Sequence, residues 1–144
     1  MMTISKKQSG ALNTAILYAY VAAGAVLGGV ARYLMSIVIH SGAGFPWATL
    51  FVNVTGSFII GFYGALSGPD GRLFTTARQR QFVMTGFCGG YTTFSSFSLE
   101  TVTLLQANMA WTALIYIAVS IVTWLLAVWL GHALASRLNR LKGS

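Results

Sequence analysis

The sequence predicts an all-α membrane protein with four transmembrane helices per chain. Of its 144 residues, 56% are hydrophobic and only 8% are charged, and the mean hydropathy is +0.70. About one quarter of the residues of a soluble domain are charged. The apolar residues form four blocks of about 20 or more, each long enough to cross a hydrocarbon core of roughly 30 Å. This composition excludes an ordinary cytosolic protein.

The charged residues indicate topology and not nucleic-acid binding. Nine Lys and Arg against two acidic residues give a formal net charge of +7. Most of the basic residues stand at the ends of apolar blocks, where they act as topology signals, so no nucleic-acid partner is expected. The single cysteine, Cys88, excludes an intrachain disulfide and a metal site built from several cysteines.

The first transmembrane helix is predicted at residues 15–39. Residues 1–14 form a polar N-terminal tail that carries Lys6 and Lys7 and is expected to stay in the cytoplasm. A basic start followed by an apolar stretch also describes a cleavable signal peptide, but three more spans follow, which favours an uncleaved helix. Gly42, Gly44 and Pro46 then predict a turn.

The second helix, at residues 47–66, carries small and polar residues on one face. Asn53, Ser57, Gly61 and Gly64 recur at i, i+4, i+8 and i+11. Helix packing accounts for the glycines, because small residues let a neighbouring backbone approach. A buried primary amide is expensive in lipid when it has no partner, so Asn53 needs either another helix or a ligand.

The third helix, at residues 81–105, follows a basic loop at residues 67–80. The glycine pair Gly89 and Gly90, followed by several hydroxyl residues, predicts a break near residues 89–93. Non-helical backbone at membrane depth is tolerated only where protein or a polar cavity covers it. The carbonyls that such a break frees are suitable ligands for a cation.

The fourth helix, at residues 111–134, carries a row of hydroxyl residues. Thr112, Tyr116, Ser120 and Thr123 lie at i, i+4, i+8 and i+11, which indicates a lined path, with helix-to-helix hydrogen bonding as the alternative. Residues 137–144 form a basic C-terminal tail. The four helices together form one channel domain at residues 15–136.

The sequence contains no pattern typical of an enzyme. It shows no paired acids, no metal-binding His motif, no phosphate-binding loop and no catalytic triad. A proton-coupled exporter of the small multidrug type would need an ionisable carboxylate in its first span, and that span has none. It remains an alternative, as does a non-conducting membrane scaffold.

The polar residues of the predicted spans suit a small anion. Neutral amide and hydroxyl donors stabilise an anion without holding it as tightly as a fixed charge does, and aromatic ring edges are electropositive. Phe94 and Phe97 lie one turn apart, although lipid contact or core packing also explains two phenylalanines. Glu100 would repel an anion, and its role stays open. The neutral donors are Asn53, Ser95, Ser98, Tyr116, Ser120 and Thr123.

The third span holds the most specific motif of the chain, which reads Gly89-Gly90-x-Thr92-Thr93-Phe94-Ser95-Ser96-Phe97-Ser98-x-Glu100. Together with Val52-Asn53 and Gly28-Gly29-x-x-Arg32, it resembles the Fluc fluoride channels, also called CrcB. The similarity runs over all four spans, at residues 24–134.

This resemblance implies a dual-topology dimer. Two chains of four helices, each with a broken third helix, would pack antiparallel and form two fluoride pores. A structural sodium ion would lie on the two-fold axis, held by the backbone carbonyls of Gly89 and Thr92.

The resemblance also assigns roles to side chains. It implies a phenylalanine box at Phe94 and Phe97, a pore asparagine at Asn53, and a hydroxyl track at Tyr116 and Ser120. One turn later the sequence has Trp124 in place of a hydroxyl residue, which leaves the continuation of the track through Thr123 open. Arg32 would anchor the first helix or attract anions into the vestibule.

The implied function is passive, electrogenic fluoride efflux across the cell inner membrane. A narrow path lined by many donors would replace the hydration shell of fluoride, and larger halides would fit it poorly. The efflux would limit fluoride toxicity. The expected partners are therefore fluoride, the structural sodium ion, membrane lipid and a second copy of the chain.

The distribution of positive charge opposes a simple antiparallel homodimer. The N-terminal tail, the loop between spans two and three and the C-terminal tail face one side, and the opposite side has at most Arg32. This bias predicts a fixed orientation with both termini in the cytoplasm. We expect the homodimer because one chain carries every motif, and a heterodimer with an oppositely biased partner is the alternative. The biased residues are Lys6, Lys7, Arg72, Arg78, Arg80, Arg137, Arg140 and Lys142.

Overall fold

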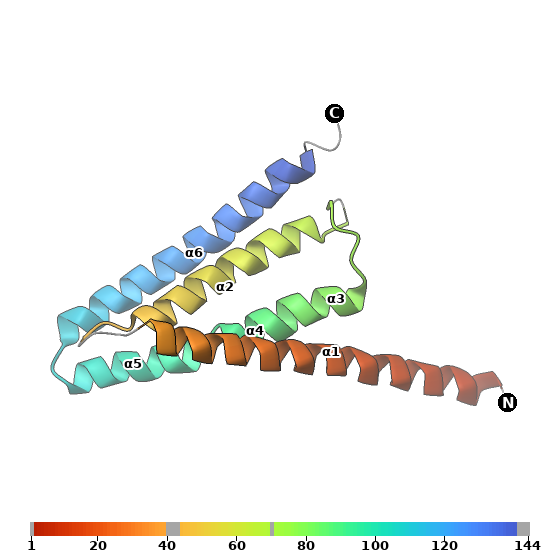
Figure 1. The fold of residues 1–144 in the computed structure, drawn as a ribbon, viewed down its shortest axis with the longest axis horizontal. Helices are drawn as coiled ribbons and strands as arrows, with labels where there is room; N and C mark the ends of the chain where they lie inside the picture. Colours follow the sequence, from red (N-terminus) through yellow and green to blue (C-terminus); the bar gives the residue numbers. More distant parts are fainter. Residues whose placement is uncertain (1, 40–43, 70, 141–144) are drawn as a thin grey trace.

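The described part of the chain is helical, with short connections (Figure 1). The computed structural model describes residues 2–39, 44–69 and 71–140, with side chains from Gly10 onward. The elements in chain order are α1 (Met2–Val38), α2 (Trp47–Leu66), α3 (Ala77–Gln81), the π-helix η1 (Phe82–Cys88), α4 (Gly89–Tyr91), α5 (Phe94–Gln106) and α6 (Ala110–Arg140).

Three of the described helices are long and apolar enough to cross a membrane. These segments are Gly10–Val38, Trp47–Leu66 and Ala110–Arg140, and they correspond to the first, second and fourth predicted spans. Helix α2 has the predicted bounds. Helix α1 instead begins at Met2, within the segment predicted as a polar tail, and α6 continues to Arg140. Extending an existing helix adds one hydrogen bond for each residue that is ordered, so polar flanks can continue it.

The third predicted span is broken, as the sequence indicates. Four short elements, α3, η1, α4 and α5, replace one continuous helix. Helix α4 ends at Tyr91, and α5 begins at Phe94. Between them, Thr92 and Thr93 have extended backbone, with ψ angles of 159° and 123°. The break therefore lies at the C-terminal edge of the predicted interval.

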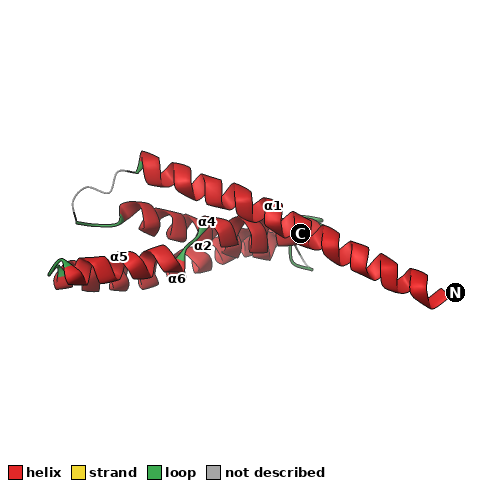
Figure 2. Cartoon of the chain, turned by 90° about the horizontal axis from the view of Figure 1, so that it is seen from below, coloured by secondary structure: helices red, strands yellow, loops and turns green. Residues whose placement is uncertain are grey.

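Glycines allow two close helix contacts. Helix α2 lies beside α6, and α1 lies along η1 and α4 (Figures 1 and 2). A Cβ atom on Gly61 of α2 would come within 2.3 Å of the Val128 carbonyl oxygen, and one on Gly28 of α1 within 2.2 Å of the Phe87 carbonyl oxygen. Backbone contact of this kind needs residues without a side chain. The interpretation of Gly61 as a packing residue is confirmed.

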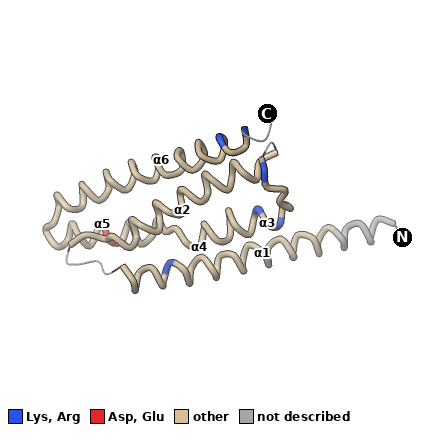
Figure 3. Tube along the Cα trace, turned by 45° about the horizontal axis from the view of Figure 1, so that its top comes forward, with Lys and Arg blue, Asp and Glu red and all other residues tan. Residues whose placement is uncertain are grey.

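The basic residues gather at one end of the molecule. The start of α1, the connection between α2 and α3 and the end of α6 lie at this end (Figures 1 and 3). Arg32 lies apart from that end, on α1. Asp70, His40 and Lys142 fall outside the described residues. The described arginines at the basic end are Arg72, Arg78, Arg80, Arg137 and Arg140.

Candidate functional site

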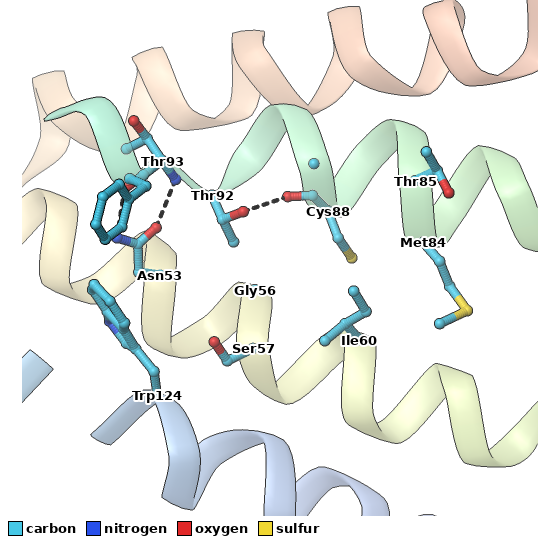
Figure 4. Close-up of a pocket in the computed structure, with 12 residues that line it drawn as sticks. Asn53, Gly56, Ser57, Ile60, Met84, Thr85, Cys88, Thr92, Thr93 and Trp124 are labelled. Atoms are coloured by element: carbon cyan, nitrogen blue, oxygen red, sulfur yellow. Dashed lines mark hydrogen bonds between the residues drawn. The ribbon is translucent and has the colours of Figure 1, made fainter. Parts of the chain in front are cut away.

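Asn53 connects α2 to the break in the third segment. Its Oδ1 accepts a hydrogen bond from the Thr93 backbone N–H at 2.7 Å, and its Nδ2 donates to the Thr93 carbonyl at 2.9 Å (Figure 4). The Asn53 side chain is only 4% exposed. The sequence left a helix or a ligand as the possible partner, and the amide instead pairs with the extended backbone that leads into α5. The Asn53 NH₂ group carries two hydrogens, so Thr93 leaves one of them available.

Two hydrogen bonds at Thr93 leave two backbone carbonyls outside the regular helical pattern. The Thr93 N–H donates to Asn53 and not to the Gly89 carbonyl, four residues earlier. The Ser96 N–H donates to the Thr93 hydroxyl at 3.1 Å and so leaves the Thr92 carbonyl outside the α5 hydrogen bonds. Helix ends leave such carbonyls in need of a partner. Gly89 and Thr92, which the resemblance associates with sodium, therefore present the chemical groups that a hard cation binds.

Phe94 and Phe97 lie next to each other in different surroundings. Their ring centroids are 5.6 Å apart. Phe97 is 7% exposed and belongs to a buried cluster with Leu50 and Tyr116, whereas Phe94 is 72% exposed. Within one chain, Phe97 is thus a core residue that borders the site, and Phe94 presents its ring at the surface.

The hydroxyl row on α6 contains two kinds of residue. Tyr116 and Ser120 are fully buried, and the Ser120 hydroxyl has no hydrogen-bond partner in the described part of the chain. The Thr123 hydroxyl instead donates to the Val119 carbonyl of its own helix at 2.6 Å. A buried polar group without a partner is costly, so Ser120 is the member of the row whose hydroxyl most needs one.

Glu100 holds three helices together. One of its carboxyl oxygens accepts a hydrogen bond from the Thr49 hydroxyl of α2 at 2.6 Å, and the other accepts from the Tyr116 hydroxyl of α6 at 2.7 Å. The sequence analysis left the role of Glu100 open and did not single out Thr49. A signal for Thr49 exists, because it precedes Asn53 by four residues and so shares its helical face.

Arg32 borders a second cavity, of about 320 Å³, together with Thr49, Ser96 and Glu100. The Nε atom of Arg32 is buried without a hydrogen-bond partner among the described residues. The guanidinium and the Glu100 carboxyl thus line one cavity, where a cation can attract anions. Of the remaining predicted residues, Ser95 is exposed, with its hydroxyl 3.2 Å from that of Thr93, and Ser98 is half-buried.

A larger cavity, of about 500 Å³, lies between the break, α2 and α6 (Figure 4). Trp124 of α6 borders it and points towards the part of the cavity where Asn53 lies. Thr93 borders both cavities, and five of the predicted site residues line one or the other: Asn53, Gly89, Thr92 and Phe94 the larger, and Arg32 the smaller. The other predicted residues line neither of them: Ser95, Phe97, Ser98, Tyr116, Ser120 and Thr123. The lining of the larger one is Asn53, Gly56, Ser57, Ile60, Met84, Thr85, Cys88, Gly89, Thr92, Thr93, Phe94 and Trp124.

Comparison with known proteins gives consistent matches over most of the chain. Residues 19–132 match the family model described as CrcB-like protein, Camphor Resistance (CrcB). A protein of Rhodopseudomonas palustris strain BisB18, named fluoride-specific ion channel FluC 1, is 67% identical over 92% of this chain and 95% of its own length. A protein of Bradyrhizobium diazoefficiens with the same name is 61% identical, over 92% and 93% of the two chains. A fluoride-specific ion channel FluC of Opitutus terrae is 52% identical, over 89% and 98%.

Proposed function

The chain belongs to the CrcB family, and from this premise we propose that it is a fluoride-selective channel for passive, electrogenic fluoride efflux. It is a multi-pass membrane protein and not an enzyme. The observation that carries the proposal is the 67% identity to a protein named fluoride-specific ion channel FluC 1 over nearly the whole of both chains. Efflux across the cytoplasmic membrane would protect the cell from fluoride.

The donors at and near the larger cavity suit this function. Asn53 keeps an N–H available, the Ser120 hydroxyl is buried without a partner among the described residues, and Phe94 borders the cavity with its ring. Fluoride is small and strongly hydrated, so a path must replace its water with several donors. Neutral donors bind weakly enough to let the ion move on.

The same proposal includes the antiparallel dimer and its sodium ion. In this arrangement the broken segment supplies the fourth crossing of each chain. The exposed face at the break includes Thr85, Gly89 and Ser95, which are poor lipid contacts, and a second chain would cover them. The Gly89 and Thr92 carbonyls would then hold a sodium ion between the chains, where it supplies positive charge that neutralises the freed carbonyl dipoles.

The test is fluoride efflux from liposomes that contain the purified protein. Potassium-loaded liposomes with valinomycin supply the balancing charge, and a fluoride electrode follows release. We expect rapid fluoride release that requires valinomycin, and little release of chloride from matched chloride-loaded liposomes. Release without valinomycin would point to an electroneutral exporter instead.

Phe94→Ile provides the pore variant for this assay. Because Phe94 is 72% exposed in one chain, its replacement should leave the protomer folded while it removes an aromatic ring from the cavity. We expect fluoride release to fall by at least about tenfold, the equivalent of one lost contact to an ion. Unchanged release would remove Phe94 from the path. A well-folded wild-type chain that releases no fluoride alone, but conducts with a second CrcB chain, would establish the heterodimer.

A further inference from the structure

Trp124 follows Ser120 by four residues, at the point where the hydroxyl row of α6 is interrupted. Tyr116, Ser120 and Trp124 are spaced four residues apart on α6 and so share one face of that helix. Thr123 does not take this place, because its hydroxyl donates to the Val119 carbonyl at 2.6 Å and to the Ser120 carbonyl at 3.2 Å. If the row continues as a series of donors, Trp124 must supply the next one.

The indole nitrogen of Trp124 is a buried donor without a partner. Its Nε1 atom makes no hydrogen bond within the described chain, and neither does the Ser120 hydroxyl one turn earlier. A buried N–H without an acceptor costs free energy, and two such donors in successive turns of one helix face make chance a poor explanation. An acceptor that enters from outside the chain would satisfy both.

The surroundings place the Trp124 side chain beside the proposed path, with its N–H buried. Trp124 lines the cavity of about 500 Å³ with Asn53 and Phe94 (Figure 4). Its ring meets that of Phe97 edge-to-face, with centroids 5.0 Å apart and an interplanar angle of 72°. This contact fixes the orientation of the indole, because both rings are bulky and Phe97 is buried.

The chemistry of the indole group selects the sign of its ligand. An indole N–H donates one hydrogen bond and has no lone pair to accept one, whereas a serine hydroxyl does both. The N–H edge of the indole therefore offers nothing to a cation, whereas it can donate to an anion or another acceptor. Fluoride is a strong acceptor that is small enough to approach a single N–H in a narrow space.

We infer that the indole N–H of Trp124 is a fluoride-binding donor, which continues the row of Tyr116 and Ser120 into the cavity beside Asn53. This inference rests on the proposed function of the chain as a fluoride channel. It makes Trp124 a binding residue of the path, whose N–H donates to the anion and cannot accept a hydrogen bond.

The first test compares two Trp-to-Phe variants in the liposome assay. Trp124→Phe keeps an aromatic ring against Phe97 and removes the N–H. Trp129→Phe is the matched control, because Trp129 lies on the same helix and is 62% exposed. We expect fluoride release to fall by about tenfold or more in Trp124→Phe, as for the loss of one hydrogen bond to a charged ligand, and to stay within about twofold of wild type in Trp129→Phe.

The second test observes the N–H directly and does not depend on how Trp124→Phe folds. A variant with Trp47, Trp111 and Trp129 replaced by Phe leaves one indole, whose ¹⁵N–H resonance is followed during titration with sodium fluoride or sodium chloride. We expect a saturable shift with fluoride and none with chloride at equal ionic strength. An indole resonance that does not respond to fluoride in a protein that conducts fluoride would overturn the inference.

These outcomes separate the two proposals. If wild-type protein releases no more fluoride than empty liposomes, in the presence or absence of a second CrcB chain, the channel function is wrong. If wild type and Trp124→Phe release fluoride equally fast, the channel function stands and the assignment of Trp124 is wrong.

Discussion

Asn53 binds the backbone of a single residue through both ends of its amide, so one side chain fixes the geometry of the break. Asn53→Asp keeps the acceptor for the Thr93 N–H but places a second acceptor against the Thr93 carbonyl. We expect this variant to lose about 1–3 kcal/mol of unfolding free energy, the usual cost of a buried acceptor left without its donor. Thermal unfolding in detergent measures the loss, and fluoride release should fall with it.

The control for this prediction is Ser57→Ala. Ser57 lies one turn along the same helix face and borders the same cavity, but its hydroxyl makes no hydrogen bond within the described residues. Its replacement should leave the unfolding midpoint unchanged. An Asn53→Asp chain that unfolds at the wild-type temperature would show that the hydrogen bonds of Asn53 do not stabilise the backbone at the break.

Two glycines distinguish contacts within one chain from contacts between chains. A Cβ atom on Gly28 would lie 2.2 Å from the Phe87 carbonyl oxygen, whereas one on Gly89 meets no described atom within 4 Å. Gly28→Ala must push α1 away from η1, so we expect a destabilisation of about 1–3 kcal/mol and a low yield of folded protein. Helix propensity alone would favour the alanine, so the loss would be steric.

Gly89→Leu should behave in the opposite way. The protomer should fold, because a Cβ atom at this position meets no described atom within 4 Å. The chains should nevertheless fail to pair if the break faces a partner across a sodium ion. Size-exclusion chromatography of the detergent-solubilised variants separates the two results. A Gly89→Leu chain that elutes as wild-type dimer would show that the break lies away from the dimer interface.

At the scale of elements, hydropathy predicted the simple helices well and the irregular one only in part. The bounds of α2 follow from an apolar block between a proline turn and a polar loop, which local sequence specifies. The π-helix η1 was not predicted, because its hydrogen-bond pattern leaves no period in the sequence. It lies where Gly86 contacts α1 so closely that a Cβ atom would be 2.6 Å from the Val21 carbonyl oxygen. Such a contact depends on tertiary packing.

The sequence predicted those parts of the site that consist of polar side chains in apolar segments. An amide in an apolar helix made Asn53 conspicuous, but its partner is a backbone group, and a backbone group has no signature in the sequence. The same limit applies to Glu100. Its charge was visible, whereas its two hydroxyl partners come from helices that are distant in the sequence.

The carboxyl of Glu100 should hold α5 between α2 and α6. Glu100→Ala leaves the hydroxyls of Thr49 and Tyr116 without their acceptor, although these residues are only 7% and 0% exposed. We expect a loss of at least about 2 kcal/mol of unfolding free energy, since two buried donors lose a carboxyl partner. Thr103→Val on the same helix is the control, because its hydroxyl bonds only the Leu99 carbonyl at an exposed position. Equal unfolding midpoints for the two variants would show that Glu100 does not stabilise the packing of α5 against α2 and α6.

At the scale of the whole molecule, the surface has an apolar part that suits contact with lipid and a more polar part that suits contact with a second chain. Large exposed apolar side chains cover α1 and α6, as expected of helices that face lipid. The region of the break instead exposes Gly89 and Ser95, beside the ring of Phe94. One chain thus has an apolar exterior with a local polar face, which favours an assembly in which two such faces meet away from lipid.

The basic end of the molecule makes this assembly testable. Five described arginines lie at the end where α1 begins and α6 ends, and an antiparallel homodimer must place that end on both sides of the membrane (Figure 3). We therefore expect a C-terminal fusion to be active both with a reporter that works only in the cytoplasm and with one that works only outside it. Arg78→Ala with Arg80→Ala should raise the outside signal, because fewer basic residues retain that end in the cytoplasm. Two results together would contradict the homodimer: a wild-type fusion that is active only in the cytoplasm, and no fluoride resistance in cells that express this chain alone. They would require a partner chain whose basic residues favour the opposite orientation.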